Sequence, residues 1–160
     1  MMIQLRRLSA SLMSLGALFL IAATSGRDVD RTAVTTPAPP MVVIDERDTK
    51  REEATPHGAI GMSTAYRISD AVPGRTMEFR KRILHVGGAI GRHPINHDEV
   101  YYVLSGAGTV TSDGVEKPLR TGMAAYLFRG AVVGIRQTGK QPLALIISYP
   151  LPAPKPDLRR

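Results

Sequence analysis

The sequence predicts an all-β fold, a small jelly-roll barrel, for residues 59–151. Short runs of β-branched, aromatic and aliphatic residues follow one another there, separated by turn-forming residues, while long helical periodicity is missing. Asp113-Gly114 stands between two of these runs and predicts a type I′ hairpin turn. Residues 143–147 are all apolar, which is typical of a strand covered on both faces.

The strands of this barrel can be assigned in chain order from the runs and the turns between them. Gly106 and Gly108 mark one reversal of the chain, and Thr138-Gly139 marks another. We expect strands over residues 63–68, 77–86, 99–104, 108–112, 115–118, 123–127, 132–137 and 143–149.

Residues 1–25 have the organisation of a secretory signal peptide. A positively charged start is followed by residues 8–23, which are apolar apart from small serine and glycine residues, and Ala23-Thr24-Ser25 provides the small residues that signal peptidase requires. The apolar span is shorter than the ~20 residues of a membrane-spanning helix, and an uncleaved N-terminal anchor is the alternative. We therefore expect export to the periplasm or secretion, with no stable membrane span after the signal is removed.

The segments that flank the barrel are predicted to be disordered. Residues 26–57 form a linker, rich in proline and threonine at 35–40 and in charges of alternating sign at 45–53, and residues 152–160 form a tail. Between the two parts of the linker, the apolar residues 41–44 could add a strand to the barrel edge or to a second subunit. The sequence thus predicts a homodimer.

Composition restricts the possible functions. The chain has no cysteine, which excludes disulfides, thiolate metal sites and thiol nucleophiles. The net charge of +7 suits an anionic small-molecule ligand. The basic residues are scattered, however, and their one run, Arg80-Lys81-Arg82, lacks interleaved aromatic residues, so nucleic-acid binding is not predicted.

Residues 91–106 contain the densest group of chemically active side chains. They run into an apolar, β-branched segment from Glu99 onward, and side chains on a strand alternate between its two faces. If the extended run reaches back to Arg92, one face carries His93, Ile95, His97, Glu99, Tyr101 and Val103. Imidazoles and a carboxylate on one face suit a divalent-metal site or an acid/base site; solvated side chains at a strand entry are the alternative.

This stretch resembles the first sequence motif of the cupin superfamily. In that motif, a glycine and two histidines one residue apart precede a glutamate, which six residues separate from a second glycine. Glu99 and Gly106 fit the pattern, and His93 fits the first histidine. Ile95 occupies the position of the second histidine, and His97 is an additional one.

The second cupin motif is matched in its spacing but not in its metal ligand. Its pattern begins at Gly122 and places Phe128 at a proline, Gly130 at a glycine, Val133 at a histidine and Gln137 at an asparagine. The resemblance implies the jelly-roll barrel, and it implies a metal site that is degenerate at two of four positions.

Several residues are candidates for the functional site. His93, His97 and Glu99 could hold one divalent metal ion of unknown identity, and Glu99 and Tyr101 are the candidate catalytic residues. The candidate ligand-binding residues are His85, Tyr101, Tyr126 and Gln137.

The predicted strand 77–86 carries side chains of two kinds. His85 shares a face with Ile83, and we expect this face to point into the barrel, near Glu99. Arg80 and Arg82 then lie on the opposite, solvated face, with a clamp for a carboxylate or phosphate as the alternative.

Three functions follow from these observations. The first is an exported cupin-domain protein that binds a small molecule inside the barrel, either directly or through a divalent metal ion. The second is a metal-dependent cupin enzyme of the dioxygenase, decarboxylase, isomerase or lyase type, and the third is a non-catalytic dimerising structural module. The fold alone does not select one of them, because one fold hosts many chemistries.

Overall fold

The computed structural model describes residues 38–152. The predicted signal peptide (1–25), residues 26–37 of the predicted linker and residues 153–160 of the predicted tail lie outside this range. Within it, no helix has the length and apolar character needed to cross a bilayer.

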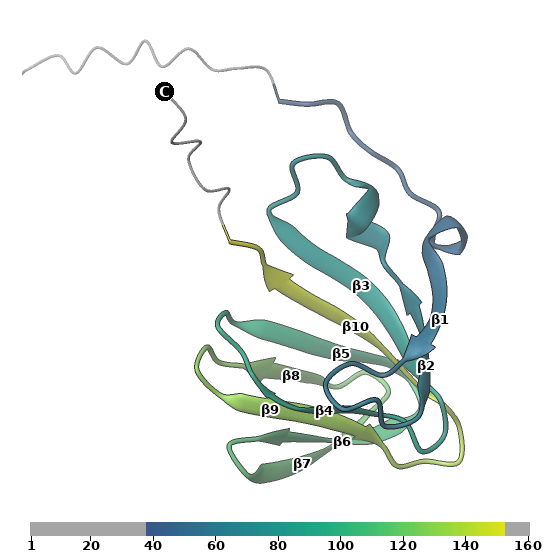
Figure 1. Cartoon of the computed structure of the whole chain (residues 1–160), viewed down its shortest axis with the longest axis vertical. Helices are drawn as coiled ribbons and strands as arrows, with labels where there is room; N and C mark the ends of the chain where they lie inside the picture. Colours follow the sequence, from purple (N-terminus) through teal and green to yellow (C-terminus); the bar gives the residue numbers. More distant parts are fainter. Residues whose placement is uncertain (1–37, 153–160) are drawn as a thin grey trace, which may run out of the picture. The chain divides into compact units, whose positions relative to one another are not determined.

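Residues 46–150 form two antiparallel sheets that face each other as a small jelly-roll barrel, as the sequence predicts (Figure 1). In spatial order, the six-stranded sheet contains β1 (Lys50–Ala54), β2 (Met62–Tyr66), β3 (Met77–Leu84), β10 (Leu143–Pro150), β5 (Glu99–Ser105) and β8 (Ala124–Leu127). The four-stranded sheet contains β4 (Ala89–Pro94), β9 (Val132–Gln137), β6 (Ala107–Ser112) and β7 (Val115–Arg120). The described chain also contains two short 3₁₀ segments, η1 (Glu46–Thr49) and η2 (Ile68–Ala71).

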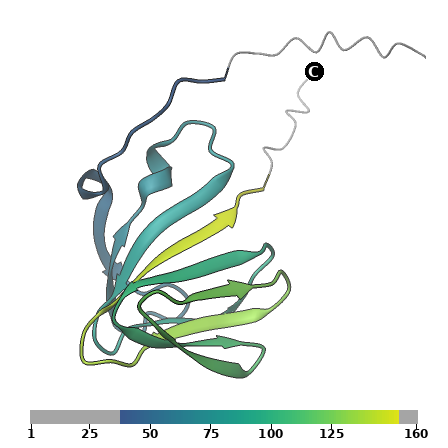
Figure 2. The ribbon, with the colours of Figure 1, turned by 180° about the vertical axis from the view of Figure 1, so that it is seen from behind.

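The hydrophobic core lies between the two sheets, which Figure 2 shows from behind. It is built from the inward-facing residues of strands in both sheets, with period-two alternation along each strand. Its most deeply buried members include Leu84, Val103, Val133, Leu143 and Leu145. Val133 thus contributes a fully buried aliphatic side chain to this core.

The β6–β7 hairpin forms as predicted. Asp113 and Gly114 both have positive φ angles, 47° and 84°, as a type I′ turn requires at its two central residues. The other predicted strands in residues 59–151 are present with ends shifted by a few residues, and β4 is an additional strand.

The prediction of a disordered linker as far as residue 57 is wrong for its last part. Residues 46–54 form η1 and β1, and β1 pairs with β2 from Lys50↔Tyr66 to Ala54↔Met62. β1 has no apolar periodicity because it is an edge strand whose side chains are mostly exposed. Charged residues are compatible with such an edge, since water reaches both faces of the strand.

Residues 41–44 do not occupy the barrel edge, where β1 lies instead. They form no strand in the described chain, and Met41 and Val43 are 88% and 82% exposed. This corrects the expectation that they extend the sheet of their own barrel.

The extended run predicted from Arg92 into the following strand is interrupted. β4 ends at Pro94, β5 begins at Glu99, and the two strands belong to different sheets. Between them, Ile95 pairs with the loop after β8, donating from its N–H to the carbonyl of Ala131 and accepting from the N–H of Gly130. His93 and Glu99 therefore do not share a face of one strand.

Candidate functional site

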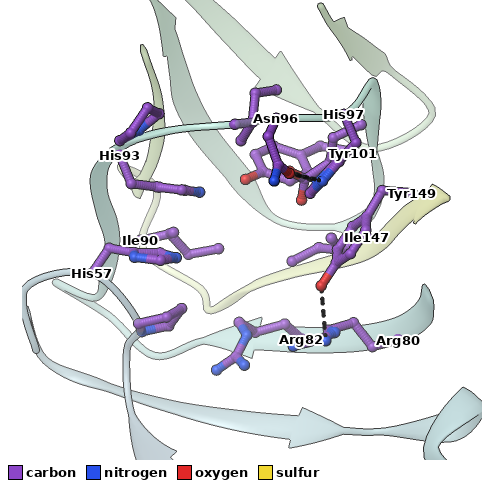
Figure 3. Close-up of a pocket in the computed structure, with 14 residues that line it drawn as sticks. His57, Arg80, Arg82, Ile90, His93, Asn96, His97, Tyr101, Ile147 and Tyr149 are labelled. Carbon is purple, nitrogen blue, oxygen red and sulfur yellow. Dashed lines mark hydrogen bonds and ion pairs between the residues drawn. The ribbon is translucent and has the colours of Figure 1, made fainter. Parts of the chain in front are cut away.

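A cavity of about 290 Å³ opens between the two sheets and is the candidate functional site (Figure 3). This volume is at the small end of the range for ligand pockets, about 300–1,000 Å³. Its lining comes from β3, β4, the β4–β5 loop, β5, β10 and the β1–β2 loop. The polar side chains of the lining are those of His57, Arg80, Arg82, His93, Asn96, His97, Glu99, Tyr101 and Tyr149.

The two arginines of β3 face the cavity, and the prediction that they lie on a solvated face is wrong. Arg82 is 2% exposed and stands opposite Leu145 of the neighbouring strand, while Arg80 stands opposite Ile147. Ile83 is only half-buried and lies on the outer face of β3. The inward-facing and outward-facing residues of β3 are therefore exchanged relative to the prediction.

The same shift removes His85 from the cavity. Its Nε2 lies 3.0 Å from the Thr64 hydroxyl and 3.6 Å from a Glu52 carboxylate oxygen, and its side chain is half-exposed. His85 therefore does not line this cavity.

Each cavity arginine is paired with a carboxylate. Arg82 donates from Nη1 to the Ser63 hydroxyl (2.6 Å) and from Nη2 to the Glu53 carboxylate (2.8 Å), and its Nε is buried without a partner in the described chain. Arg80 donates from Nε to Glu78 (2.8 Å) and from Nη2 to the Tyr149 hydroxyl (3.2 Å). Among the described residues, Nη1 of Arg80 makes no hydrogen bond and can serve a ligand.

Glu99 and His97 meet inside the cavity. His97 Nε2 lies 3.5 Å from a Glu99 carboxylate oxygen but has no hydrogen-bond partner in the described part of the chain. Burial raises the pKa of Glu99 to about 7, although Arg80 acts in the opposite direction. Burial also lowers the pKa of His97, and the nearby His93 adds to this effect, so His97 is neutral near pH 7.

His57 is a lining residue that the sequence analysis did not find. Its ring stacks on that of His93 with centroids 3.6 Å apart and planes 10° from parallel. The close approach depends on Gly91, where a Cβ atom would lie 1.4 Å from the His57 carbonyl oxygen. In the sequence, the glycine at position 91 indicates only that another segment could approach the backbone closely at this point. It does not reveal that this segment is the one that carries His57.

The donor set of the cavity does not fit a divalent metal ion. Residues 38–152 contain no group of three histidine or acidic side chains placed to hold one. His93 is held through Nδ1, 2.8 Å from the Gly91 carbonyl oxygen, and its ring stacks on His57. Ile95 and Val133, at the two altered motif positions, are buried in the apolar core.

The remaining predicted residues divide between the cavity and the framework. Tyr101 lines the cavity and is 1% exposed; burial, followed by the charge of Glu99, raises its pKa. Tyr126 lies outside the cavity, where its hydroxyl donates to Asp98 (2.7 Å). Gln137 also lies outside, because its side chain accepts from the Gly87 N–H and donates to the carbonyls of Gly139 and Gln141. Neither residue lines this cavity, and ligand binding by Tyr126 and Gln137 stays a prediction.

Comparisons with known proteins give the following likenesses. Residues 81–149 match the sequence model described as "Cupin domain". A search of the curated proteins finds no match. The predicted oxalate decarboxylase from Thermotoga maritima superposes with a TM-score of 0.62 at 22% identity, covering 69% of this chain and 100% of that chain.

Two further solved structures share the fold. The polyketide cyclase RemF from Streptomyces resistomycificus gives a TM-score of 0.61 at 18% identity, covering 72% of this chain and 82% of its own. A Cupin 2 conserved barrel domain protein from Salinispora arenicola gives 0.52 at 18% identity, with coverages of 71% and 89%. At these identities the likenesses establish the barrel and leave its ligand open.

The pKa of Glu99 predicts how stability depends on pH. Because the folded chain holds the Glu99 proton more tightly than the ordinary pKa of 4.5 implies, the free energy of unfolding falls as the pH rises from 4.5 to about 7. The full loss is about 3 kcal/mol. Glu99→Gln, which cannot ionise, removes this fall when unfolding by urea is measured across that pH range.

Glu116→Gln is the matched control. Glu116 is exposed, and its hydrogen bond to Arg136 lowers its pKa, so its replacement leaves the fall in stability in place. A Glu99→Gln variant that loses stability as steeply as the unchanged protein contradicts the assignment.

Proposed function

Since the chain belongs to the cupin superfamily, we propose that its barrel binds a small organic anion directly, through arginine and without a metal ion. The observation that carries this proposal is the Arg80 side chain, which lines the cavity and keeps one guanidinium nitrogen without a partner among residues 38–152. Guanidinium groups match carboxylates in geometry and charge, and such hydrogen bonds are stronger than neutral ones.

The neighbouring groups support an anion at this place. Burial raises the pKa of Glu99 to about 7, so below that pH its carboxyl is mostly protonated and can donate a hydrogen bond to an anion instead of repelling it. Tyr101 and Tyr149 supply hydroxyl groups on the same cavity wall. The position of an anion near Arg80 is thus compatible with the charges around it.

Metal-dependent catalysis is the alternative. Cupins commonly bind a divalent metal ion, and the proximity of His97 and Glu99 is the observation that favours one in this chain. Against it stand Ile95 and Val133, which are apolar and buried at two positions where the family has ligands. We therefore derive no reaction step through a metal ion.

Replacement of Arg80 tests the proposal. With acetate, pyruvate, succinate and benzoate as probes, we expect at least one to bind, and Arg80→Gln to weaken that binding by about tenfold or more in isothermal titration calorimetry. Arg92→Gln is the matched control, because Arg92 is exposed on β4 and lies outside the cavity lining. The Arg92→Gln variant should bind the same carboxylate with the affinity of the unchanged protein.

The same preparation distinguishes the metal-dependent alternative. Elemental analysis of protein purified without chelator is expected to find no stoichiometric metal. Stoichiometric metal that disappears in His97→Ala would favour the enzyme. The absence of binding for all four carboxylates, or equal binding by Arg80→Gln, would contradict the anion site.

We also propose that the protein is exported, on the basis of the signal-like composition of residues 1–25. When the protein is expressed in a Gram-negative bacterium, we expect it in the periplasmic fraction. Its mass, measured by mass spectrometry, should be that of a chain that starts near residue 26. Leu15→Arg interrupts the apolar span and should leave the full-length chain in the cytoplasm, whereas Val43→Arg should not. Full-length protein in the membrane fraction would instead indicate an uncleaved anchor.

Finally, we propose that two copies associate through the apolar residues 41–44. Met41 and Val43 are largely exposed in the single chain, and Phe79 and Tyr102 are half-exposed on the outer face of the six-stranded sheet. Light scattering at micromolar concentration should give the mass of a dimer, and Val43→Asp should shift it toward that of a monomer. Val86→Asp, at an exposed turn, is the control, and a monomeric unchanged protein would contradict the proposal.

A further inference from the structure

We propose that the ligand is a small planar monocarboxylate, held with its flat body between two pairs of stacked rings, and that His57 is one of its binding residues. This inference rests on the proposed function, the direct binding of an organic anion at Arg80. It adds the shape and charge of the ligand and a contact from the β1–β2 loop.

The first observation is the arrangement of the rings. His57 and His93 stack on one side of the cavity, and His97 and Tyr149 stack on the other side with centroids 4.1 Å apart and planes 14° from parallel (Figure 3). Arg82 lies between the two sides at the bottom of this view. A flat unsaturated ligand can place its faces or edges against such rings, an arrangement that aromatic groups favour.

The second observation is that His57 is held firmly in place. The Thr55 N–H and hydroxyl donate to the carbonyls of Gly61 and Ile60, and the Gly91 N–H donates to the carbonyl of Pro56 (3.1 Å). His57 itself has a φ of 56°, a left-handed conformation that is costly for a residue with a side chain. The surrounding contacts therefore fix the backbone of this loop beside the cavity, where the exposed His57 ring stacks on His93.

The third observation concerns hydrogen-bonding capacity. Many polar atoms of the lining already have partners in the protein: Tyr149 accepts from Arg80, His93 bonds the Gly91 carbonyl, and His97 Nδ1 bonds the Asn96 side chain (2.9 Å). Ile90, Ile95 and Ile147 supply apolar surface between them. A polyhydroxylated ligand would leave most of its hydroxyl groups unpaired here, which is costly in a buried site.

The fourth observation is the charge balance, which favours a monoanion. Glu53 pairs with both Arg82 and Arg67. Glu78 pairs with both Arg80 and Arg75, and Arg75 also pairs with Asp70. These groups together carry one positive charge more than they carry negative charges, which suits a monoanion better than a dianion such as phosphate. Nη1 of Arg80, which has no partner among the described residues, can donate to one oxygen of a single carboxylate.

A pair of probes with equal charge and nearly equal size tests the planarity of the ligand. Benzoate is flat, whereas cyclohexanecarboxylate has a puckered ring with the same number of carbon atoms. By isothermal titration calorimetry, benzoate should bind the unchanged protein about fivefold to tenfold more tightly than cyclohexanecarboxylate, the factor expected for ring stacking.

The role of His57 is tested by variants that preserve the loop. His57→Asn removes the ring but retains a residue that tolerates positive φ, and it should reduce the benzoate preference at least threefold while leaving cyclohexanecarboxylate nearly unchanged. His57→Phe restores a ring and should restore the preference. His85→Asn, at a half-exposed histidine outside the cavity, should have no effect.

The outcomes separate this inference from the function on which it rests. Equal affinities for the two probes, both lost in Arg80→Gln, would overturn the planar ligand and retain the anion site. A benzoate preference unchanged in His57→Asn would overturn the role of His57. If neither probe binds, both the inference and the anion site fail. Gly91→Ala is a second route, since it displaces the His57 carbonyl and should also abolish the preference.

Discussion

The ion pair between Arg82 and Glu53 is the contact on which the site depends. It places a nearly fully buried guanidinium of β3 against a carboxylate of the edge strand β1, and the Ser63 hydroxyl of β2 completes the group. A buried charge of this kind is tolerated only when it is paired, and removal of one partner typically costs about 3–5 kcal/mol. Arg82 therefore fixes three strands relative to one another with one side chain.

The position of β1 then determines where His57 lies. β1 has little apolar surface of its own, so its ladder to β2 and the Glu53–Arg82 pair hold it on the sheet. The loop that follows β1 closes onto Gly91, and this contact sets the stacked rings at the cavity. The Glu53–Arg82 pair of the six-stranded sheet thus helps to position the cavity wall that His57 forms with His93 of the four-stranded sheet.

The sequence predicted the barrel because its turns and its apolar alternation are local signals. Asp113-Gly114 specifies its own turn geometry, and the Glu99-to-Gly106 segment forms β5 with Tyr101 and Val103 inward. The phase of β3 could not be obtained in this way. Ile83 is apolar on the outer face, whereas Arg82 is charged and buried, so hydrophobicity indicated the wrong face of this strand.

Contacts between distant segments explain the other differences. β1 is a strand because β2 pairs with it, although its own residues are nearly all charged. The break between β4 and β5 depends on hydrogen bonds from Ile95 to the loop around Ala131, which no local pattern encodes. Gln137 stands at a position of the second motif, whereas Tyr126 stands at none; the side chains of both form hydrogen bonds within the protein.

The charges of the cavity connect the altered motif to the proposed ligand. A metal ion beside Glu99 would stabilise its ionised form, whereas in the present surroundings burial keeps the pKa near 7 and favours the acid. Ile95 and Val133 are apolar and lie in the core, so they cannot coordinate a divalent ion. His97 and Glu99 would then have to replace the water ligands of such an ion almost without other protein ligands. An anion that takes one hydrogen bond from Arg80 and one from protonated Glu99 requires no such ion, because it brings the charge that this cavity can compensate.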